Sequence, residues 1–415
     1  MANYTEKIFT PGQIVLESVS LISNNGFVFD LRPVMTDLTL TESMADVFVS
    51  GALGITESLN LPRFGPIVGN EYVKVVYYTP SRQKVDYTFA VTRISKRVLD
   101  NKSLTYYLEL SSIGRVLSNF KQISKSFSNM SYSEMALSIF NDVLKTDKNR
   151  LIYKDTQFKK KYVAPFMFPG DLLTELASRS IDPTNNANFI FYETLKNDYH
   201  FRPVFDDSKP VFEYANFMSG IAGVNTLLEY TRIRELEIFS TADVFKNMDA
   251  GVFGYKASEI DTTKKTITHS SATYHQLFNS SFHINEFPIL PANQYIGNSS
   301  NKYEVYPKAS FSQDNIANNE NYKEVITTRQ FQLASSDSFS IGINVYGDSD
   351  RHIGDKVRVL ILAPQAADET TEKYDPYLSG NYTIARIKNI IQRNQYTTNL
   401  LLIKDSNWQA IKEIN

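Results

Sequence analysis

The stretch YLSGNYTIARIKNIIQRNQYTTNLLLIKDS, residues Tyr377 to Ser406, decides how this chain folds. Two runs rich in apolar residues flank the polar segment 392–395, and this arrangement predicts a β-hairpin. A similar stretch, YTFAVTRISKRVLDNKSLTYYLELSS, begins at Tyr87, with a usable hairpin turn at 100–102. The chain therefore contains two related hairpins, and the second copy needs an explanation.

The two hairpins align without a gap. Arg386 lies 293 positions after Arg93, and Leu401 lies 293 positions after Leu108. Most of the matched positions are apolar or aromatic, which is typical of strands that share one buried face. The structural positions expected for the repeat are Phe89, Val91, Arg93, Ile94, Leu108 and Leu110 in the first copy, and Tyr382, Ile384, Arg386, Ile387, Leu401 and Ile403 in the second.

The order of the surrounding elements supports a duplication. A strand led by glycine precedes each hairpin, GNEYVKV in the first copy and GDKVRV in the second. Further upstream, SMADVFVSGAL matches NMDAGVFGYKA. Three matched elements in the same order favour an internal repeat, although two unrelated antiparallel units with generic strand composition remain an alternative. If the chain forms a cyclic trimer, two barrels in each of three chains give a ring of six similar units.

Composition is typical of a folded protein rich in β-structure. The 415 residues exceed what one hydrophobic core usually serves, and 13% of them are aromatic. The formal charge is only −2, so no basic footprint indicates tight binding to nucleic acid or to an anionic membrane. The sequence contains no cysteine, which excludes disulfides and thiolate chemistry. Neither a signal peptide nor a membrane-spanning run is expected, because the N-terminus is polar and no long apolar run occurs.

The middle of the chain has a different character. In SYSEMALSIFNDVLK, Ser131 lies three residues before Glu134, and this spacing predicts a capping box at the start of a helix. PGDLLTELASRSIDP predicts a second helix, and ANFIFYETLKNDYHFRP predicts two short strands around a turn. Strands are expected again in RQFQLA, FSIGINVYG and HIGDKVRVLILAP.

These patterns predict a mainly β fold with an α+β insertion: two antiparallel β-barrels with peripheral domains. The expected divisions are a first barrel at 1–118, an α+β domain at 119–222, a second barrel at 223–262 and 328–406, a loop-rich peripheral insertion at 263–327, and a C-terminal tail at 407–415.

In the order of these segments, the chain resembles the baseplate hub proteins of contractile-tailed bacteriophages, which are related to the hub portion of type VI secretion spike proteins. TDLTLTESMADVFVSGALGITESLNL and GPIVGNEYVKV resemble the opening of the first tube-like barrel. GRVLSNFKQISKSFSNMSYSEMALSIFNDVL resembles the helical link after it, and PFMFPGDLLTELASRSIDPTNNANFIFYETLKNDYHFRP resembles the second domain of the family. GDKVRVLIL and the opening hairpin resemble the close of the second barrel.

The resemblance implies a homotrimer whose paired barrels build a pseudo-hexameric ring. In the family such a ring docks to the sixfold tail tube on one face and to a threefold spike on the other, and its lumen conducts DNA at ejection. The implied partners are therefore the chain itself, a central spike protein, tail-tube or tube-initiator proteins and baseplate wedge proteins. DNA is expected only in transit, no membrane anchor is expected, and the implied location is the virion, assembled in the host bacterial cytoplasm.

Motifs of catalysis and ligand binding are missing from the sequence. The five histidines, at 200, 269, 275, 283 and 352, do not stand at metal-ligand spacing. YGDSDRH, with Asp348 and Asp350, lacks the remaining ligands of a calcium loop, so a polar turn is expected there. Asp206 and Asp207 are neighbours in sequence, which does not establish the cleft of a glycosidase. No catalytic, cofactor-binding or metal-binding residue is predicted, and no cofactor.

The expected function is a structural hub subunit rather than an enzyme. A carbohydrate-binding or receptor-binding tail protein is the alternative, to which exposed aromatic residues of the 263–327 insertion would contribute. A glycan hydrolase is a third and less supported hypothesis, because wall-degrading activity would more plausibly reside on a spike partner.

Overall fold

The structure of the chain is a computed structural model. It describes residues 11–64, 67–79, 84–100, 102–146, 148–216, 230–241, 244–261, 264–289, 302–307, 322–336, 339–363, 374–392 and 395–410.

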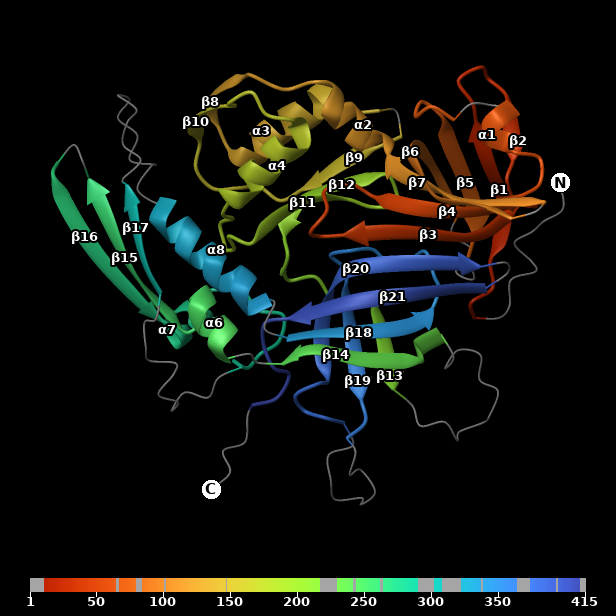
Figure 1. The fold of residues 1–415 in the computed structure, drawn as a ribbon. Helices are drawn as coiled ribbons and strands as arrows, with labels where there is room; N and C mark the ends of the chain where they lie inside the picture. The colour runs from red at the N-terminus through yellow and green to blue at the C-terminus, as the bar shows by residue number, and fades with distance from the viewer. Residues whose placement is uncertain are drawn as a thin grey trace.

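One large, almost entirely antiparallel sheet forms the body of the molecule (Figure 1). Its strands follow the order β14-β18-β21-β20-β3-β4-β7-β6-β5-β1-β2, and β13 and β19 extend it beside β20. The first half contains β1 (Val15–Ile22), β2 (Val28–Asp30), β3 (Met35–Ser43), β4 (Ser50–Glu57), β5 (Tyr72–Tyr78), β6 (Lys84–Asp100) and β7 (Ser103–Ser112). The second half contains β13 (Phe212–Asn216), β14 (Glu235–Thr241), β18 (Phe339–Tyr346), β19 (Lys356–Ile361), β20 (Gly380–Gln392) and β21 (Gln395–Lys404).

The mainly β fold agrees with the sequence, but two separate closed barrels do not form among the described residues. The two halves instead share a single sheet, because β20 pairs with β3 from Arg386↔Ser43 to Gln392↔Asp37. Each half nevertheless has its own hydrophobic core, one around Leu53, Phe89 and Leu108 and the other around Ile341, Tyr382 and Leu402. Two cores under one sheet follow from two copies of the same alternating pattern.

A compact α+β unit lies beside the sheet and contacts it near the ends of β3 and β4 (Figure 1). Its capping box forms as predicted: Ser131 Oγ accepts from the Glu134 N–H, and Glu134 Oε2 accepts from the Ser131 N–H at 2.7 Å. The predicted second helix and the two strands around 196–198 are also present. The elements are α2 (Ile113–Phe120), β8 (Ser126–Met130), α3 (Tyr132–Ile139), a π-helix η2 (Phe140–Leu144), β9 (Arg150–Tyr153), β10 (Lys160–Val163), α4 (Pro169–Ser178), β11 (Phe189–Glu193) and β12 (Asp198–Pro203).

The peripheral insertion is larger than the sequence indicated. The expected boundary at 262/263 falls inside the hairpin of β15 and β16, where Asp261 pairs with Thr266. The boundary at 327/328 falls inside α8, so RQFQLA is helix and not strand. This unit has its own small core around Phe253, Tyr274 and Phe331. Its elements are α6 (Val244–Ala250), β15 (Gly254–Asp261), β16 (Thr266–Thr273), α7 (Tyr274–Asn279), β17 (Lys302–Pro307) and α8 (Tyr322–Ser336).

Two smaller features complete the architecture. A short helix α1 (Leu61–Phe64) follows β4, and Glu57 accepts hydrogen bonds from the backbone N–H groups of Leu59 and Leu61 at its start. After β21, Asn407 forms a backbone bridge with Phe287, so the beginning of the C-terminal tail is attached to the peripheral insertion. Within the part of the chain that the structure describes, no helix is both long and apolar enough to cross a membrane.

Candidate functional site

The two predicted hairpins lie in the same sheet, separated by β3 and β4 (Figure 1). β6 with β7 forms the first hairpin and β20 with β21 forms the second. All twelve sequence-predicted positions are on these four strands. In the first strand of each hairpin, Phe89, Val91, Tyr382, Ile384 and Ile387 are buried, Ile94 is half-buried, and Arg93 and Arg386 are exposed.

Both hairpins contain a β-bulge at the same matched place. In the first, the register shifts between Val91 and Arg93, and in the second it shifts between Ile384 and Arg386. A bulge places two residues of one strand against one of its partner, and it bends the strand and increases its twist. The offset of 293 therefore holds along the first strand of the hairpin as far as Ser95, for this shared bulge as well as for the side chains.

The register of the second strand differs from the sequence alignment by one residue. Val91 pairs with Leu110 while Ile384 pairs with Leu402, and Ile94 pairs with Leu108 while Ile387 pairs with Leu400. The counterparts of the buried Leu108 and Leu110 are thus Leu400 and Leu402.

The expected counterparts, Leu401 and Ile403, lie on the opposite face and are half-buried. The cause is a second bulge in β6, between Ser95 and Val98, that β20 lacks. A single extra residue exchanges the two faces of every position beyond it, and a gapless alignment cannot detect it.

The strand order repeats beyond the hairpins. β3-β4-β7-β6-β5 in the first half corresponds to β14-β18-β21-β20-β19 in the second, and every neighbouring pair in both series is antiparallel. The glycine-led strands GNEYVKV and GDKVRV are matched, since they form β5 and β19. The third sequence match is wrong, because NMDAGVFGYKA belongs to α6 and β15 of the peripheral unit. β18 is the structural counterpart of β4.

The open face of the two halves forms a continuous polar surface. It carries hydroxyl, amide and charged side chains on neighbouring strands, and these are exposed or half-buried: Thr39, Thr41, Thr105, Tyr107, Glu109, Arg386, Lys388 and Asn399. The apolar Leu401 lies half-buried on the same face. On the second half this face contains a groove of about 570 Å³. The acids Glu235 and Glu237 of β14 line one side, and the bases Arg386 and Lys388 of β20 line the other.

A buried carboxylate holds the junction between the halves. Glu42, at the end of β3, accepts hydrogen bonds from His352 Nδ1 at 3.1 Å and from the backbone N–H of Leu195 at 3.0 Å. Its other oxygen accepts from the Ile353 N–H at 3.3 Å. One side chain of the first half thereby fixes the β18–β19 segment of the second half and the β11–β12 turn of the α+β unit.

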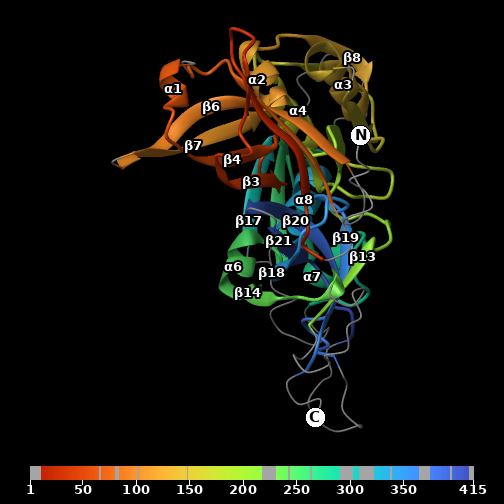
Figure 2. The ribbon, with the colours of Figure 1, turned by 90° about the vertical axis from the view of Figure 1, so that its right-hand side faces the viewer.

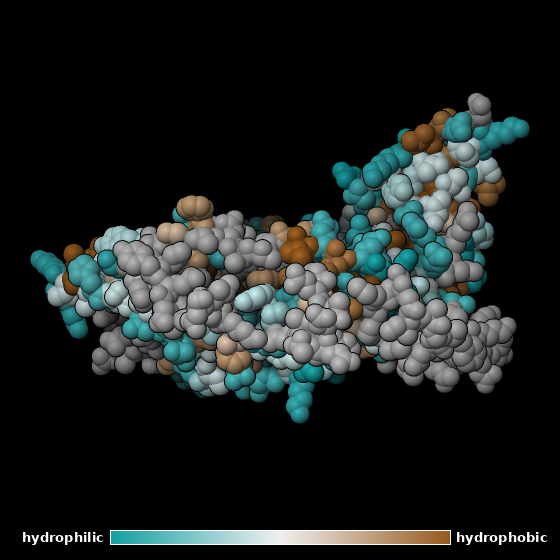
Figure 3. Space-filling model, turned by 90° about the horizontal axis from the view of Figure 1, so that it is seen from below, coloured by the Kyte–Doolittle hydropathy of each residue, from teal (hydrophilic) through white to brown (hydrophobic). Residues whose placement is uncertain are grey.

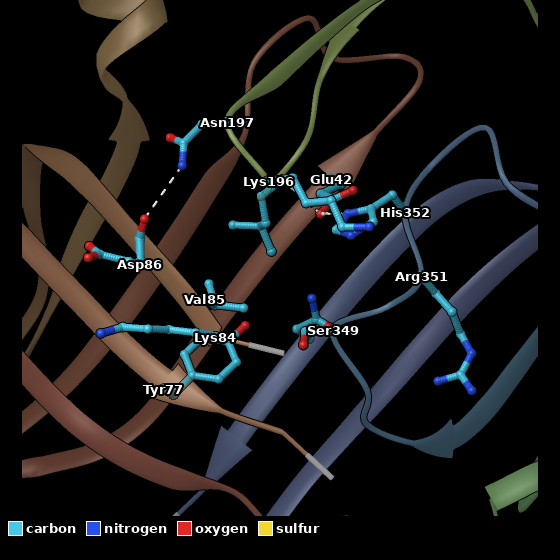
Figure 4. Close-up of a pocket in the computed structure, with 12 residues that line it drawn as sticks. Glu42, Tyr77, Lys84, Val85, Asp86, Lys196, Asn197, Ser349, Arg351 and His352 are labelled. Carbon is cyan, nitrogen blue, oxygen red and sulfur yellow. Dashed lines mark hydrogen bonds and ion pairs between the residues drawn. The ribbon is translucent and has the colours of Figure 1, made fainter. Parts of the chain in front are cut away.

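A cavity of about 260 Å³ lies beside this junction, and Figure 4 shows Lys196 next to the pair formed by Glu42 and His352. Burial acts to lower the pKa of His352, but the Glu42 carboxylate outweighs burial and raises this pKa above 6.5. The buried Glu42 carboxylate therefore favours the charged form of the His352 imidazole. Tyr77 and Lys84 line the same cavity from the first half.

A second buried carboxylate attaches the α+β unit to the first half. Glu193, at the end of β11, accepts from Tyr87 Oη at 2.8 Å and Tyr199 Oη at 2.6 Å, and from the Val49 N–H at 3.2 Å. Burial raises the pKa of Glu193, and these hydrogen bonds oppose the rise. Neither Glu42 nor Glu193 could be identified from the sequence, because a lone Glu at a strand end carries no pattern.

The other aspartates and histidines considered in the sequence form hydrogen bonds and ion pairs within the fold. Asp348 and Asp350 lie in the segment between β18 and β19, where the backbone N–H of Asp350 bonds to Asp348. Asp206 is 3.3 Å from Lys356 Nζ, an ion pair that ties the chain before β13 to β19. His283 is 2.7 Å from Asp405, and no group of three potential metal ligands occurs among the described residues.

No family model and no curated protein matches the sequence of the chain, whereas solved structures match its fold. Among solved structures, the tail protein from Neisseria meningitidis MC58 superposes with a TM-score of 0.58 and 12% identity, over 94% of this chain and 97% of that one. The tail protein of prophage MuSo2 from Shewanella oneidensis gives a TM-score of 0.57 and 10% identity, over 94% and 98%.

A chain of the Francisella PdpA-VgrG complex also matches, with a TM-score of 0.51 and 10% identity, over 97% of this chain and 59% of that one. At these identities the likeness establishes the fold, and it extends over nearly the whole of this chain. The resemblance expected from the sequence is confirmed at this level: the chain has the fold of phage tail proteins, which a chain of the PdpA-VgrG complex shares.

Proposed function

We propose that this chain is a structural hub subunit of a phage tail baseplate. Three copies form a pseudo-hexameric ring that adapts the sixfold tail tube to a threefold central spike and leaves a channel for DNA. The observation that carries the proposal is the matched strand order of the two halves within one chain. A threefold assembly of a twofold-repeated chain presents six similar surfaces, which is what a sixfold partner requires.

The open face of the sheet suits this role. Its hydroxyl, amide and charged groups offer a hydrated surface, and a chain with a formal charge of −2 has no strong net attraction for passing DNA. The proposed partners are the chain itself, a spike protein, tail-tube or tube-initiator proteins and wedge proteins, all within the virion. The role is structural, and enzymatic activity is not part of it.

Imaging the purified protein down its symmetry axis tests the proposal. We expect six similar lobes around an open channel, and native mass spectrometry is expected to give the mass of three chains. The protein is imaged alone and after co-expression with its cognate spike, because the spike could be needed for assembly. A monomer in both preparations, or a ring of any other symmetry, would contradict the proposal.

A carbohydrate-binding or receptor-binding tail protein is the second candidate. The observation that favours it is the exposed apolar surface of the peripheral sheet, where Ile267 is 59% exposed, Tyr303 61% and Val305 51%. Exposed aromatic and apolar residues of this kind occur at binding surfaces. Reproducible binding on a glycan array that is lost in Tyr303→Ala would support this function, and a uniformly negative array would count against it.

A further inference from the structure

Three parts of the chain meet at the cavity beside the pair formed by Glu42 and His352. Tyr77 of β5, Lys196 of the β11–β12 turn and His352 of the β18–β19 segment all line this cavity of about 260 Å³. Figure 2 shows the first half of the sheet above the second, with β3 and β20 at the boundary between them. A ligand in this cavity would contact both halves and the α+β unit at once.

Two buried polar groups on the cavity wall lack hydrogen-bond partners among the described residues. Tyr77 is fully buried, and its hydroxyl is one of these groups. His352 is 7% exposed, and its Nε2 is the other, although its Nδ1 bonds to Glu42. Leaving a buried polar group without a partner is costly, and native proteins normally satisfy such groups with protein, water or a ligand.

Two acceptors on the same wall are already occupied. The Glu42 carboxylate accepts from His352 and from two backbone N–H groups. Asn389 Oδ1 accepts from the hydroxyls of Tyr396 and Thr398, both at 2.9 Å, so the amide nitrogen is the end of Asn389 that is left to bind a ligand. The groups that remain open are donors, and a ligand that fits them must supply acceptor atoms.

The charges around His352 favour a negatively charged acceptor. Burial and the Lys196 ammonium both act to lower the pKa of His352, against the Glu42 carboxylate that raises it. Two neighbouring cations repel each other in a site shielded from water, and an anion between them removes this repulsion. Lys196 is exposed and forms no ion pair within the described part of the chain, so the cavity is open to solvent on its side.

We propose that this cavity binds a small oxyanion, such as phosphate or a carboxylate. Tyr77 Oη and His352 Nε2 donate to its oxygens, and the Lys196 ammonium balances its charge. Hydrogen bonds to a charged group are stronger than those between neutral groups. The bound anion connects the three parts of the chain at the junction, and it stabilises the folded protein in proportion to its occupancy. The site is a property of the single chain and does not depend on the proposed ring.

The other charged groups of the wall have partners elsewhere in the fold: Lys84 with Glu17 at 3.2 Å, Asp86 with Lys74 at 3.6 Å, and Arg351 with the ring of Phe212 at 3.7 Å. Figure 4 shows the Lys84 side chain extending away from His352. Lys196 is therefore the lysine of this wall whose charge is available to a ligand, and Lys84 provides a matched comparison.

Calorimetric titration of the natural protein with inorganic phosphate tests the site. We expect saturable binding with one site per chain, weakened about tenfold or more in Lys196→Ala. Lys84→Ala removes the same charge from the same wall and is expected to change the affinity by less than about twofold, because its ammonium is paired at the surface. Equal affinities in the two variants would overturn the proposal.

Tyr77→Phe tests the donors without disturbing the packing of the ring. Because the Tyr77 hydroxyl has no partner among the described residues, this variant is expected to melt no lower than the natural protein when phosphate is absent. Phosphate is expected to raise its melting temperature less than that of the natural protein. An equal rise in both proteins would contradict the role of this hydroxyl in binding.

Anions also gather weakly at surface charges, and Figure 3 shows hydrophilic residues spread over the face seen from below. The control is therefore sodium chloride at equal ionic strength, which is expected to give no saturable binding. Parallel titrations with sulfate and acetate identify the ligand: binding of sulfate but not acetate indicates a tetrahedral oxyanion, and binding of acetate indicates a carboxylate. Failure of all three anions to bind, or an effect that chloride reproduces, would overturn the proposal.

Discussion

At the scale of single residues, the faces of β21 decide which substitutions the fold tolerates. Leu400 is 1% exposed in the core of the second half, whereas Leu401 lies half-buried on the open face. The sequence alignment assigned Leu401 to the core together with Leu108, and the ladder corrects this assignment to Leu400.

Leu400→Asp is therefore expected to abolish soluble folded protein. It places an unpaired carboxylate in an apolar core, a change that destabilises by about 4 kcal/mol or more. Leu401→Asp, the matched control, is expected to stay within about 1 kcal/mol of the natural protein, because its carboxylate remains in water. Soluble yield and thermal melting measure both, and the reverse order of stabilities would refute the assignment of faces.

His352 makes the stability of the inter-half junction depend on pH. Its pKa is raised in the folded protein, so its contribution is fully present below the ordinary value of 6.5 and is lost as the pH rises through the raised folded value. We expect the difference in melting temperature between the natural protein and His352→Gln to shrink as the pH rises from below 6.5 through the raised folded value.

In the difference between the natural protein and His352→Gln, the contributions of the other titrating groups to the pH dependence of stability cancel, because both proteins contain these groups. His200, whose pKa burial lowers to about 3, does not titrate in this range. In the background of Glu42→Gln the same comparison is expected to reverse its pH dependence, because burial without the carboxylate lowers the His352 pKa, so His352 then destabilises the fold as the pH falls below 6.5. A pH-independent difference in the natural background would contradict the role of this pair.

At the scale of elements, the sequence predicts best those features in which nearby side chains form hydrogen bonds with the backbone. The Ser131–Glu134 capping box was visible in the sequence because its partners are three residues apart, and the structure has both hydrogen bonds. RQFQLA was misread as strand because it alternates over six residues, while its place within the longer α8 depends on packing against the peripheral core. Short apolar alternation does not separate a strand from a buried helix.

Ser131→Ala is expected to destabilise the α+β unit by about 1 kcal/mol, since it leaves the Glu134 N–H without its cap. Ser128→Ala, an exposed position in the preceding β8, is the control and is expected to leave stability unchanged. Urea unfolding followed by circular dichroism measures both variants. Equal midpoints for the two would contradict the role of the cap.

At the scale of the whole molecule, duplication explains the shape of the sheet. Two copies of one strand series join edge to edge through β20 and β3. A heterologous contact repeated around an axis closes into a ring. The six-lobed ring that we propose is a consequence of this single feature.

The sequence by itself determined the β character, the two hairpins with their polar turns, and the helices of the α+β unit. These follow from periodicity, turn residues and caps, which act over a few residues. Only the tertiary structure decided the one-residue shift of the second strand, the single sheet that the two halves share, and the buried carboxylates Glu42 and Glu193. Each of these depends on partners more than a hundred residues away or on one unpaired bulge residue, and local sequence patterns contain neither.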